Sequence, residues 1–240
     1  MAMQAAVLAL ADDHLILGHR LSEWCGHAPM LEEDLALPNM ALDLIGTART
    51  LYDYAARLEG KGRSEDDLAF LRVEREYRNL LLCERPNGDF AQTMLRQIYF
   101  AAFMEPYWQA ATGSSDEVIR GVAGKAVKEM AYHIRHAGEW VIRLGDGTDE
   151  SAAKMRAAVE ELHRFTGEMF EESDASDVLE GMLPRRADLR AAWDCVIGMV
   201  FSEALLEVPE VRFPQTGGRQ GLHGEPLGHL LAEMQYLQRA

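Results

Sequence analysis

Hydrophobic and polar residues along most of the chain recur with helical spacing. Apolar positions three or four residues apart predict helices over 4–26, 31–58, 66–84, 89–112, 115–145, 149–172, 188–206 and 226–239. A strand-like alternation does not extend over any useful length. Several of the predicted helices exceed 20 residues and are joined mostly by short connections, which favours an antiparallel bundle with extra helices packed around it. We therefore predict an all-α fold and a single domain over 1–240.

The breaks between the predicted helices carry residues that start or stop a helix. Gly60 and Gly62 follow one helix, and Arg85-Pro86-Asn87-Gly88 follows the next. Ser115 is the predicted N-cap ahead of an acidic first turn, and Thr148 is the predicted N-cap of the helix that follows. These residues make the connections short and well defined.

One connection is longer. The segment 207–226, EVPEVRFPQTGGRQGLHGEP, is rich in proline and glycine and lies between two predicted helices. A loop of this length is usually functional or an interface. The helix after it carries an apolar strip, which must be covered by this chain's own core or by a partner, and its members are Leu227, Leu230, Leu231, Met234 and Leu237. The sequence does not decide between packing on this chain's own core and packing on a partner.

Composition excludes several classes of partner. The formal net charge of −15 argues against a nucleic-acid surface and an anionic membrane surface, both of which need clustered Lys and Arg. No apolar run is long enough to span a membrane. The N-terminus lacks a basic segment before its apolar residues, which argues against a signal peptide. Three separated cysteines, Cys25, Cys83 and Cys195, are most simply placed in a reducing cytoplasm.

A carboxylate-bridged metal pair in a helical bundle requires Glu-x-x-His on each of two helices. The spacing places a carboxylate and an imidazole one turn apart on the same helix face. The chain contains this motif once, at Glu160 and His163. Met155, Val159 and Leu162 belong to the apolar stripe of that helix, and Glu160 lies on the opposite side, facing solvent. The motif therefore does not predict a metal site.

The stretch KEMAYHIRHAGEW, 128–140, has the outline of a metal site without the full set of ligands. Glu129, His133 and His136 lean toward one side of a helix. The residue three positions before His133 is Met130, whose thioether does not suit an oxygen-preferring metal. His133 lies inside the apolar stripe, so we predict a buried histidine bonded to a neighbour.

Other candidate sites are weaker. Glu23 and His27 lack evident companions on other helices. Glu105 is a lone carboxylate, and Pro106 after it predicts an interruption of the helix. TGGRQG, 216–221, lacks the preceding strand and the Lys-Ser/Thr of a phosphate-binding loop, so we interpret it as an ordinary loop.

Three long blocks resemble one family over essentially the whole chain. They are LILGHRLSEWCGHAPMLEEDLALPNMALDLIGTARTLYDYAARLEG at 15–60, KEMAYHIRHAGEWVIRLGDGTDES at 128–151 and GGRQGLHGEPLGHLLAEMQYLQR at 217–239. They are similar to the C-subunit family of bacterial phenylacetyl-CoA epoxidase. The resemblance implies a ferritin-like four-helix bundle with additional packed helices. It also implies a structural role beside a related catalytic A subunit, which carries the di-iron centre of a complex that converts the ring of phenylacetyl-CoA to an epoxide.

The resemblance also assigns remnant ligand positions. Set against the A subunit's pattern, Glu23 falls at the first-helix carboxylate, and Leu44 and Thr47 fall where the second helix has Glu and His. Met130 replaces the Glu of the fourth helix, and His133 retains its His. The resemblance thus implies no metal and no cofactor in this chain, and it suggests that Glu23 lies beside His133.

Three functions remain open from the sequence. The chain is a non-catalytic subunit pairing with the A subunit, a di-metal oxidase with an atypical ligand set, or a free-standing helical binding protein. Other subunits of the complex and a second copy of this chain are further partners that the sequence leaves open.

Overall fold

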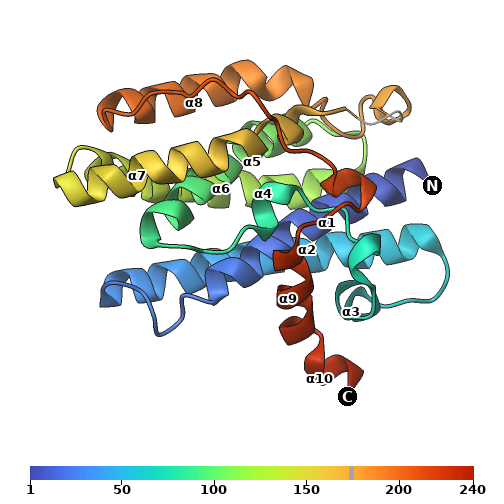
Figure 1. Ribbon diagram of the computed structural model, residues 1–240. Coiled ribbons are helices and arrows are strands. Elements are labelled where there is room, and N and C mark those ends of the chain that lie inside the picture. Colours follow the sequence, from blue (N-terminus) through green and yellow to red (C-terminus); the bar gives the residue numbers. More distant parts are fainter. Residues whose placement is uncertain (173–175) are drawn as a thin grey trace. The chain divides into compact units, whose positions relative to one another are not determined.

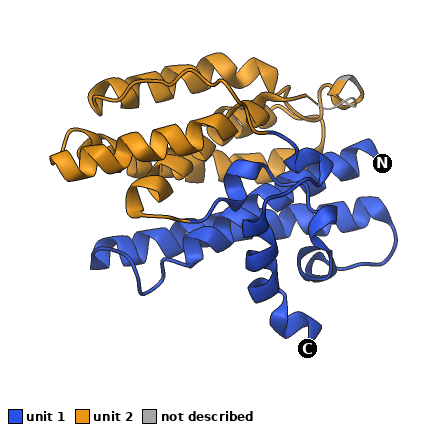
Figure 2. Cartoon of the chain, in the orientation of Figure 1, with its two compact units in different colours: residues 1–86, 216–240 blue, residues 87–215 orange. Residues whose placement is uncertain are grey.

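The computed structural model describes residues 1–172 and 176–240, which form helices and connecting segments and contain no strand. The predicted all-α fold is confirmed (Figure 1). The chain divides into two compact units (Figure 2). Unit 1 comprises 1–86 and 216–240, and unit 2 comprises 87–215. Whether the units form one domain over 1–240 stays a prediction.

Unit 1 is built on two long helices, α1 (Ala2–Ser22) and α2 (Leu31–Glu59). They run antiparallel, because Gly18 packs against Leu44 while Asp12, earlier in α1, bonds to Tyr52, later in α2. Acidic residues occupy the first turn of α2, where they complement the helix dipole. The helix ends at Gly60, whose φ of 68° gives the left-handed cap that glycine adopts without strain.

Shorter elements complete unit 1. They are α3 (Glu65–Phe70), a 3-10 turn at Glu74–Glu76, α4 (Leu81–Glu84), a 3-10 turn at Gly218–Gln220, α9 (Glu225–Met234) and α10 (Tyr236–Arg239). A capping box between Ser64 and Asp67 starts α3. The prediction of one continuous helix over 66–84 is therefore wrong, because α3 ends at Phe70 and α4 begins only at Leu81.

Unit 2 is built on α5 (Phe90–Ala111) and α6 (Glu117–Gly145), which are also antiparallel. Gln97 bonds to His133, and Phe90 packs edge-on against Trp140, near the other end of α6. The N-cap of α6 is Asp116, not the predicted Ser115, because the Asp116 carboxylate accepts from the Ile119 amide. α5 runs through Pro106 without the predicted interruption.

The remaining helices of unit 2 are α7 (Asp149–Leu162) and α8 (Arg190–Glu203), with 3-10 turns at His163–Phe165, Gly167–Phe170, Ser176–Leu179 and Ala187–Leu189. Thr148 caps α7 as predicted. The helix predicted to reach residue 172 ends at Leu162. The four long helices of the predicted ferritin-like bundle are thus present as one antiparallel pair in each unit, with further helices packed on each pair.

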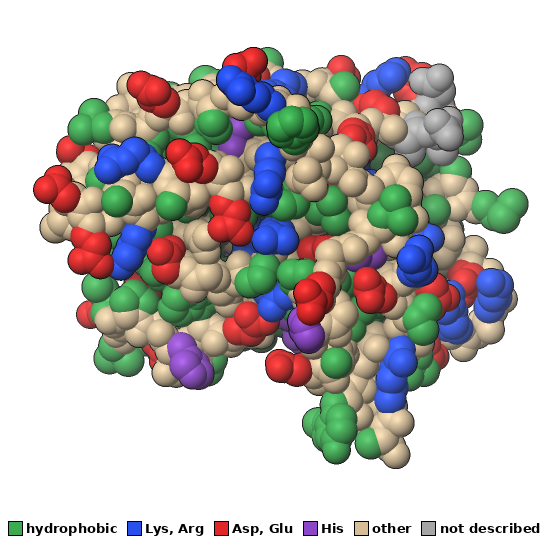
Figure 3. All heavy atoms as spheres, in the orientation of Figure 1, with side chains coloured by type: hydrophobic (Ala, Val, Ile, Leu, Met, Phe, Trp, Pro, Cys, Tyr) green, Lys and Arg blue, Asp and Glu red, His purple; other side chains and the backbone are tan. Residues whose placement is uncertain are grey.

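The segment 207–240 is shared between the units. Residues up to Gln215 belong to unit 2, and residues from Thr216 belong to unit 1. TGGRQG is a loop with one 3-10 turn, as predicted. Along the C-terminal strip, Leu227, Leu230 and Leu231 are buried in unit 1, whereas Leu237 is 82% exposed. Hydrophobic side chains are correspondingly visible at the C-terminal end of the molecule (Figure 3).

Candidate functional site

The implied ligand positions on α2 lie in an apolar environment. Leu44 and Thr47 are buried, and a Cβ at Gly18 of α1 would lie 3.4 Å from the Cβ of Leu44. This close approach fixes which level of α1 faces Leu44. A Leu at that level supplies no metal-binding atom, so the residues present do not fit the carboxylate-and-imidazole set of a di-iron helix.

Glu23 lies outside that level. α1 ends at Ser22, and Glu23 is its C-cap, with a side chain 38% exposed and paired with Arg20 at 2.7 Å. Five residues separate it from Gly18, or about 7 Å along a helix axis. Within unit 1 this geometry argues against a place for Glu23 beside Leu44 and Thr47.

α1 does bury a histidine one turn before Gly18. This residue is His14, whose burial we did not predict from the sequence. His14 is fully buried, and its Nδ1 donates to the carbonyl oxygen of Leu10 at 2.8 Å. That bond fixes the tautomer of a neutral ring, because a carbonyl oxygen only accepts. A polar triplet, Asp12-Asp13-His14, inside an otherwise apolar helix was the signal that could have found it.

Met130 and His133 are buried on α6, as the predicted apolar stripe requires. The Nε2 amide of Gln97 on α5 donates to Nδ1 of His133 at 3.0 Å. The prediction that His133 is buried and hydrogen-bonded is confirmed. Its pairing with Glu23, which belongs to unit 1, stays a prediction.

The single Glu-x-x-His motif is oriented as predicted. Glu160 is exposed and His163 is buried, so the two do not share a face of the helix. The hydroxyl of Tyr99 lies 3.0 Å from Nδ1 of His163. Burial lowers the pKa of His163 below its usual value. Glu105 is half-buried, and burial raises its pKa.

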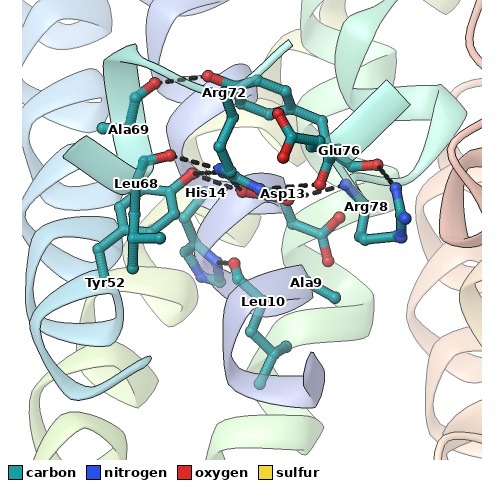
Figure 4. Close-up of polar contacts among 12 residues, drawn as sticks. Ala9, Leu10, Asp13, His14, Tyr52, Leu68, Ala69, Arg72, Glu76 and Arg78 are labelled. Atoms are coloured by element: carbon teal, nitrogen blue, oxygen red, sulfur yellow. Dashed lines mark hydrogen bonds and ion pairs between the residues drawn. The ribbon is translucent and has the colours of Figure 1, made fainter. Parts of the chain in front are cut away.

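The described residues hold no group of three or more His, Cys, Asp or Glu side chains placed to bind a metal ion. The buried charges of unit 1 have another arrangement, centred on α1. The fully buried carboxylate of Asp12 accepts from both terminal nitrogens of Arg72 and from the Tyr52 hydroxyl at 2.6 Å. Figure 4 shows Arg72 and Tyr52 beside α1. It also accepts from the backbone amide of Arg78 at 2.7 Å.

This cluster sets the protonation of its members. Burial alone would lower the pKa of Arg72, but the Asp12 carboxylate raises it well above the usual arginine value, so the guanidinium stays charged. Burial and the Asp12 charge raise the pKa of Tyr52 well above its usual value. Burial raises the pKa of Tyr77 to about 12. None of these groups is a proton donor or acceptor near neutral pH, and the cluster is therefore structural.

Asp13 fastens the C-terminal segment to the same helix. Its carboxylate accepts from the Leu80 amide at 2.7 Å and from both terminal nitrogens of Arg219, at 2.9 and 2.6 Å. The Arg219 guanidinium also donates to the carbonyl oxygen of Arg78. A bidentate contact between a guanidinium and a carboxylate is directional as well as strong. Arg219 therefore anchors the loop TGGRQG rather than a phosphate.

His223 makes a second anchor. Its Nδ1 lies 2.8 Å from the buried Glu84 carboxylate, and its Nε2 lies 3.0 Å from the carbonyl oxygen of Tyr77. Both partners only accept, so both ring nitrogens donate when the ring is protonated. Burial opposes the charge, but the bonds to Glu84 and Tyr77 prevail and raise the pKa of His223. The Gly224 amide donates to the same carboxylate at 2.7 Å.

None of the helices in the described part of the chain is long and apolar enough to cross a membrane. Comparison with known proteins then gives one consistent result. The family described as "Phenylacetic acid catabolic protein" matches residues 1–240. The C subunit of 1,2-phenylacetyl-CoA epoxidase from Escherichia coli (strain K12) is 47% identical over 239 residues, which cover 99% of this chain and 96% of that protein. The resemblance seen in the sequence is confirmed, and the chain belongs to the phenylacetic acid catabolic protein family.

Proposed function

We propose that this chain is a non-catalytic, structural subunit of a multicomponent di-iron oxygenase that epoxidises the aromatic ring of phenylacetyl-CoA in phenylacetate degradation. It pairs in the cytoplasm with a related catalytic A subunit, which holds the di-iron centre. The observation that carries the proposal is the similarity to the C subunit of the Escherichia coli epoxidase over nearly the full length of both chains.

The buried residues support the non-catalytic part of the proposal. Leu44 and Met130 stand where the A subunit's pattern has carboxylates, and both side chains are buried. An ionised carboxylate in either position would need metal or hydrogen-bonding partners to offset its desolvation. Two buried carboxylates of unit 1 instead form ion pairs with distant segments, Asp12 with Arg72 and Asp13 with Arg219. Nothing in this set of residues calls for a metal.

Reconstitution tests the proposal. We expect the related A subunit, co-expressed with this chain, to co-elute with it on size exclusion, to bind iron and to epoxidise phenylacetyl-CoA when a separate reductase subunit supplies electrons. The A subunit alone should lose solubility or activity. An A subunit that is fully active and soluble without this chain would contradict the structural role.

Iron loading of the isolated chain separates this function from that of an independent oxidase. We expect no stoichiometric tightly bound iron after loading and desalting. The double variant Glu23→Gln/His133→Gln is the matched control, since it removes the two remnant positions and should leave the iron content unchanged. Iron that is bound stoichiometrically by the unaltered chain and lost in the double variant would support the oxidase instead.

A further inference from the structure

Three aromatic side chains of unit 2 form a contact that the proposed function does not use. Tyr99 lies on α5, His163 directly follows α7, and Trp193 lies on α8; α5 packs against both other helices (Figure 1). All three side chains are buried. The ring centroids of Tyr99 and Trp193 are 5.6 Å apart, and those of His163 and Trp193 are 6.1 Å apart.

The hydrogen bond between Tyr99 and His163 provides a place for a proton. The Tyr99 hydroxyl is 3.0 Å from Nδ1 of His163. Burial, reinforced by the Arg190 charge, lowers the pKa of His163, which favours the neutral ring. In the tautomer that carries its proton on Nε2, Nδ1 accepts the hydroxyl proton of Tyr99. Burial raises the pKa of Tyr99 well above its usual value, so the resting phenol keeps its proton. A buried phenol can lose an electron without leaving an uncompensated charge only if its proton moves at the same time.

Trp193 is held against Tyr99 by its own hydrogen bond. The indole Nε1–H donates to the backbone oxygen of Tyr99 at 3.0 Å. The guanidinium of Arg190 lies 5.5 Å from the Trp193 ring centroid. The same guanidinium is paired with the Asp194 carboxylate at 2.8 Å. Loss of an electron from Trp193 leaves a cation on the indole, whereas loss of an electron and a proton from Tyr99 leaves a neutral phenoxyl radical and places the positive charge on His163.

We propose that Trp193, Tyr99 and His163 form a one-electron redox relay. A one-electron oxidant stronger than the Trp193 radical cation takes one electron from Trp193 and is itself reduced. Tyr99 then returns an electron to the Trp193 radical cation while its O–H bond breaks and a new N–H bond forms at Nδ1 of His163. The products are neutral Trp193, a neutral Tyr99 radical and protonated His163; one electron from a reductant and return of the proton restore the resting state.

The chemical class of oxidant is a strong one-electron oxidant of the kind that oxygen activation generates. Its origin in a partner subunit rests on the proposed function, whereas the relay itself does not. The test can therefore be made on the isolated chain with an artificial oxidant. Failure of the relay would leave the proposed function untouched, and failure of reconstitution would leave the relay untouched.

The chain offers an attachment point for that oxidant. Cys195 is exposed and lies on α8 with Trp193, Cys25 is exposed in unit 1, and Cys83 is buried. In a Cys25→Ser background, a ruthenium polypyridyl complex attached to Cys195 becomes a strong one-electron oxidant when flashed in the presence of an electron-accepting quencher. Transient absorption and electron paramagnetic resonance then report indole and tyrosyl radicals.

We expect a neutral tyrosyl signal that grows as the indole signal decays and that forms more slowly in deuterated water. Tyr99→Phe, which removes only the hydroxyl, should abolish the tyrosyl signal. Tyr107→Phe, on the same helix and also buried, is the matched control and should retain it. His163→Phe should slow formation of the Tyr99 radical about 100-fold, the lower end of what a positioned proton acceptor contributes.

Two results would overturn the relay. One is a tyrosyl signal that persists in Tyr99→Phe, since the radical would then lie elsewhere. The other is a rate of radical formation that neither deuterated water nor His163→Phe changes. The isotope measurement needs no change to Tyr99 or His163, so it decides the point even if the His163 variant fails to fold.

Discussion

The two units bury polar side chains against their long helix pairs, but the chemistry of those side chains differs. Unit 1 buries ion pairs, such as Asp12–Arg72. Unit 2 buries neutral pairs, such as Gln97–His133 and Tyr99–His163. It also buries the charged side chains of Arg96 and Glu168, so the comparison is between these particular pairs. A buried charge that loses its partner costs far more free energy than a buried amide that does so. The units should therefore respond differently to loss of one polar group.

The difference follows from what each cluster connects. In unit 2 the Gln97–His133 bond joins two regular helices that already pack through an apolar stripe. In unit 1 the carboxylates of α1 hold segments with little regular structure of their own, through Arg72 and Arg219. In those segments, strong and directional side-chain contacts fix the backbone in place of the regular hydrogen bonds of a helix.

Removal of the central carboxylate of unit 1 should have the largest effect. Asp12→Ala leaves the buried Arg72 guanidinium without its counter-charge, and we expect the free energy of unfolding to fall by about 3–5 kcal/mol. Urea unfolding followed by circular dichroism measures the loss. The double variant Asp12→Leu/Arg72→Met is the control, because it removes both charges and should recover part of the stability. A loss below about 1 kcal/mol for Asp12→Ala would mean that the pair is not buried as described.

The matched change in unit 2 should cost less. Gln97→Leu removes a neutral partner of His133 from a fully buried site, and we expect a loss of about 1–3 kcal/mol. The same urea measurement applies. A Gln97→Glu variant sharpens the comparison, since it introduces a buried charge and should be more destabilising than Gln97→Leu. Equal costs for Asp12→Ala and Gln97→Leu would remove the distinction between the two units.

The difference between local and long-range contacts explains where the sequence predicted the structure and where it did not. Over α6 the apolar stripe through Met130 and His133 has a helical period, and the predicted range of 115–145 differs from Glu117–Gly145 by two residues at one end. The period is a local property of the sequence, so it predicts both the helix and its buried face.

Between α3 and α4 the local signal was overridden. The predicted helix over 66–84 is interrupted where the backbone amides of Arg78 and Leu80 donate to Asp12 and Asp13 of α1. Such bonds join residues more than 60 positions apart, and no spacing rule within the segment reveals them. From the sequence we therefore did not predict the buried network that Asp12 and Asp13 organise.

His223 gives a pH-dependent prediction of intermediate size. Because its folded pKa is raised, its contribution to stability is present below the unfolded value of about 6.5 and is lost as pH rises through the higher folded value. The neutral ring can donate only one of its two hydrogen bonds. We expect the C-terminal segment 217–235 to lose about 1–2 kcal/mol of protection between about pH 6 and pH 9.

Hydrogen exchange, corrected for its intrinsic pH dependence, measures that protection in the segment. His223→Gln should abolish the pH dependence, because its amide can donate to Glu84 but does not titrate. His229→Gln is the control: His229 is exposed on α9 and pairs only weakly with Glu225, so this change should leave the profile as it is. If protection in the unaltered chain does not change with pH, protonation of His223 does not stabilise the segment.

The smallest effect on stability concerns the end of the C-terminal strip. Deletion of 207–240, the obvious test for an interface, would remove Arg219 and His223 and leave Asp13 and Glu84 as buried carboxylates without these partners. The truncated chain should therefore be unstable for reasons unrelated to a partner. A single substitution at the exposed end avoids that problem. Leu237→Ser should change the free energy of unfolding by less than about 0.5 kcal/mol, since the side chain is 82% exposed.

Leu230→Ser is the matched change on the same strip, at a leucine that is buried in unit 1. It should cost several times more stability, because it removes apolar volume from the core and introduces a hydroxyl there. Affinity for the A subunit, measured by titration with both variants, then shows whether the apolar strip packs only on this chain's own core or also contacts the partner. If Leu237→Ser weakens association while leaving stability unchanged, the exposed end of the strip contacts the partner. If the affinity is unchanged, the strip serves this chain's own core alone.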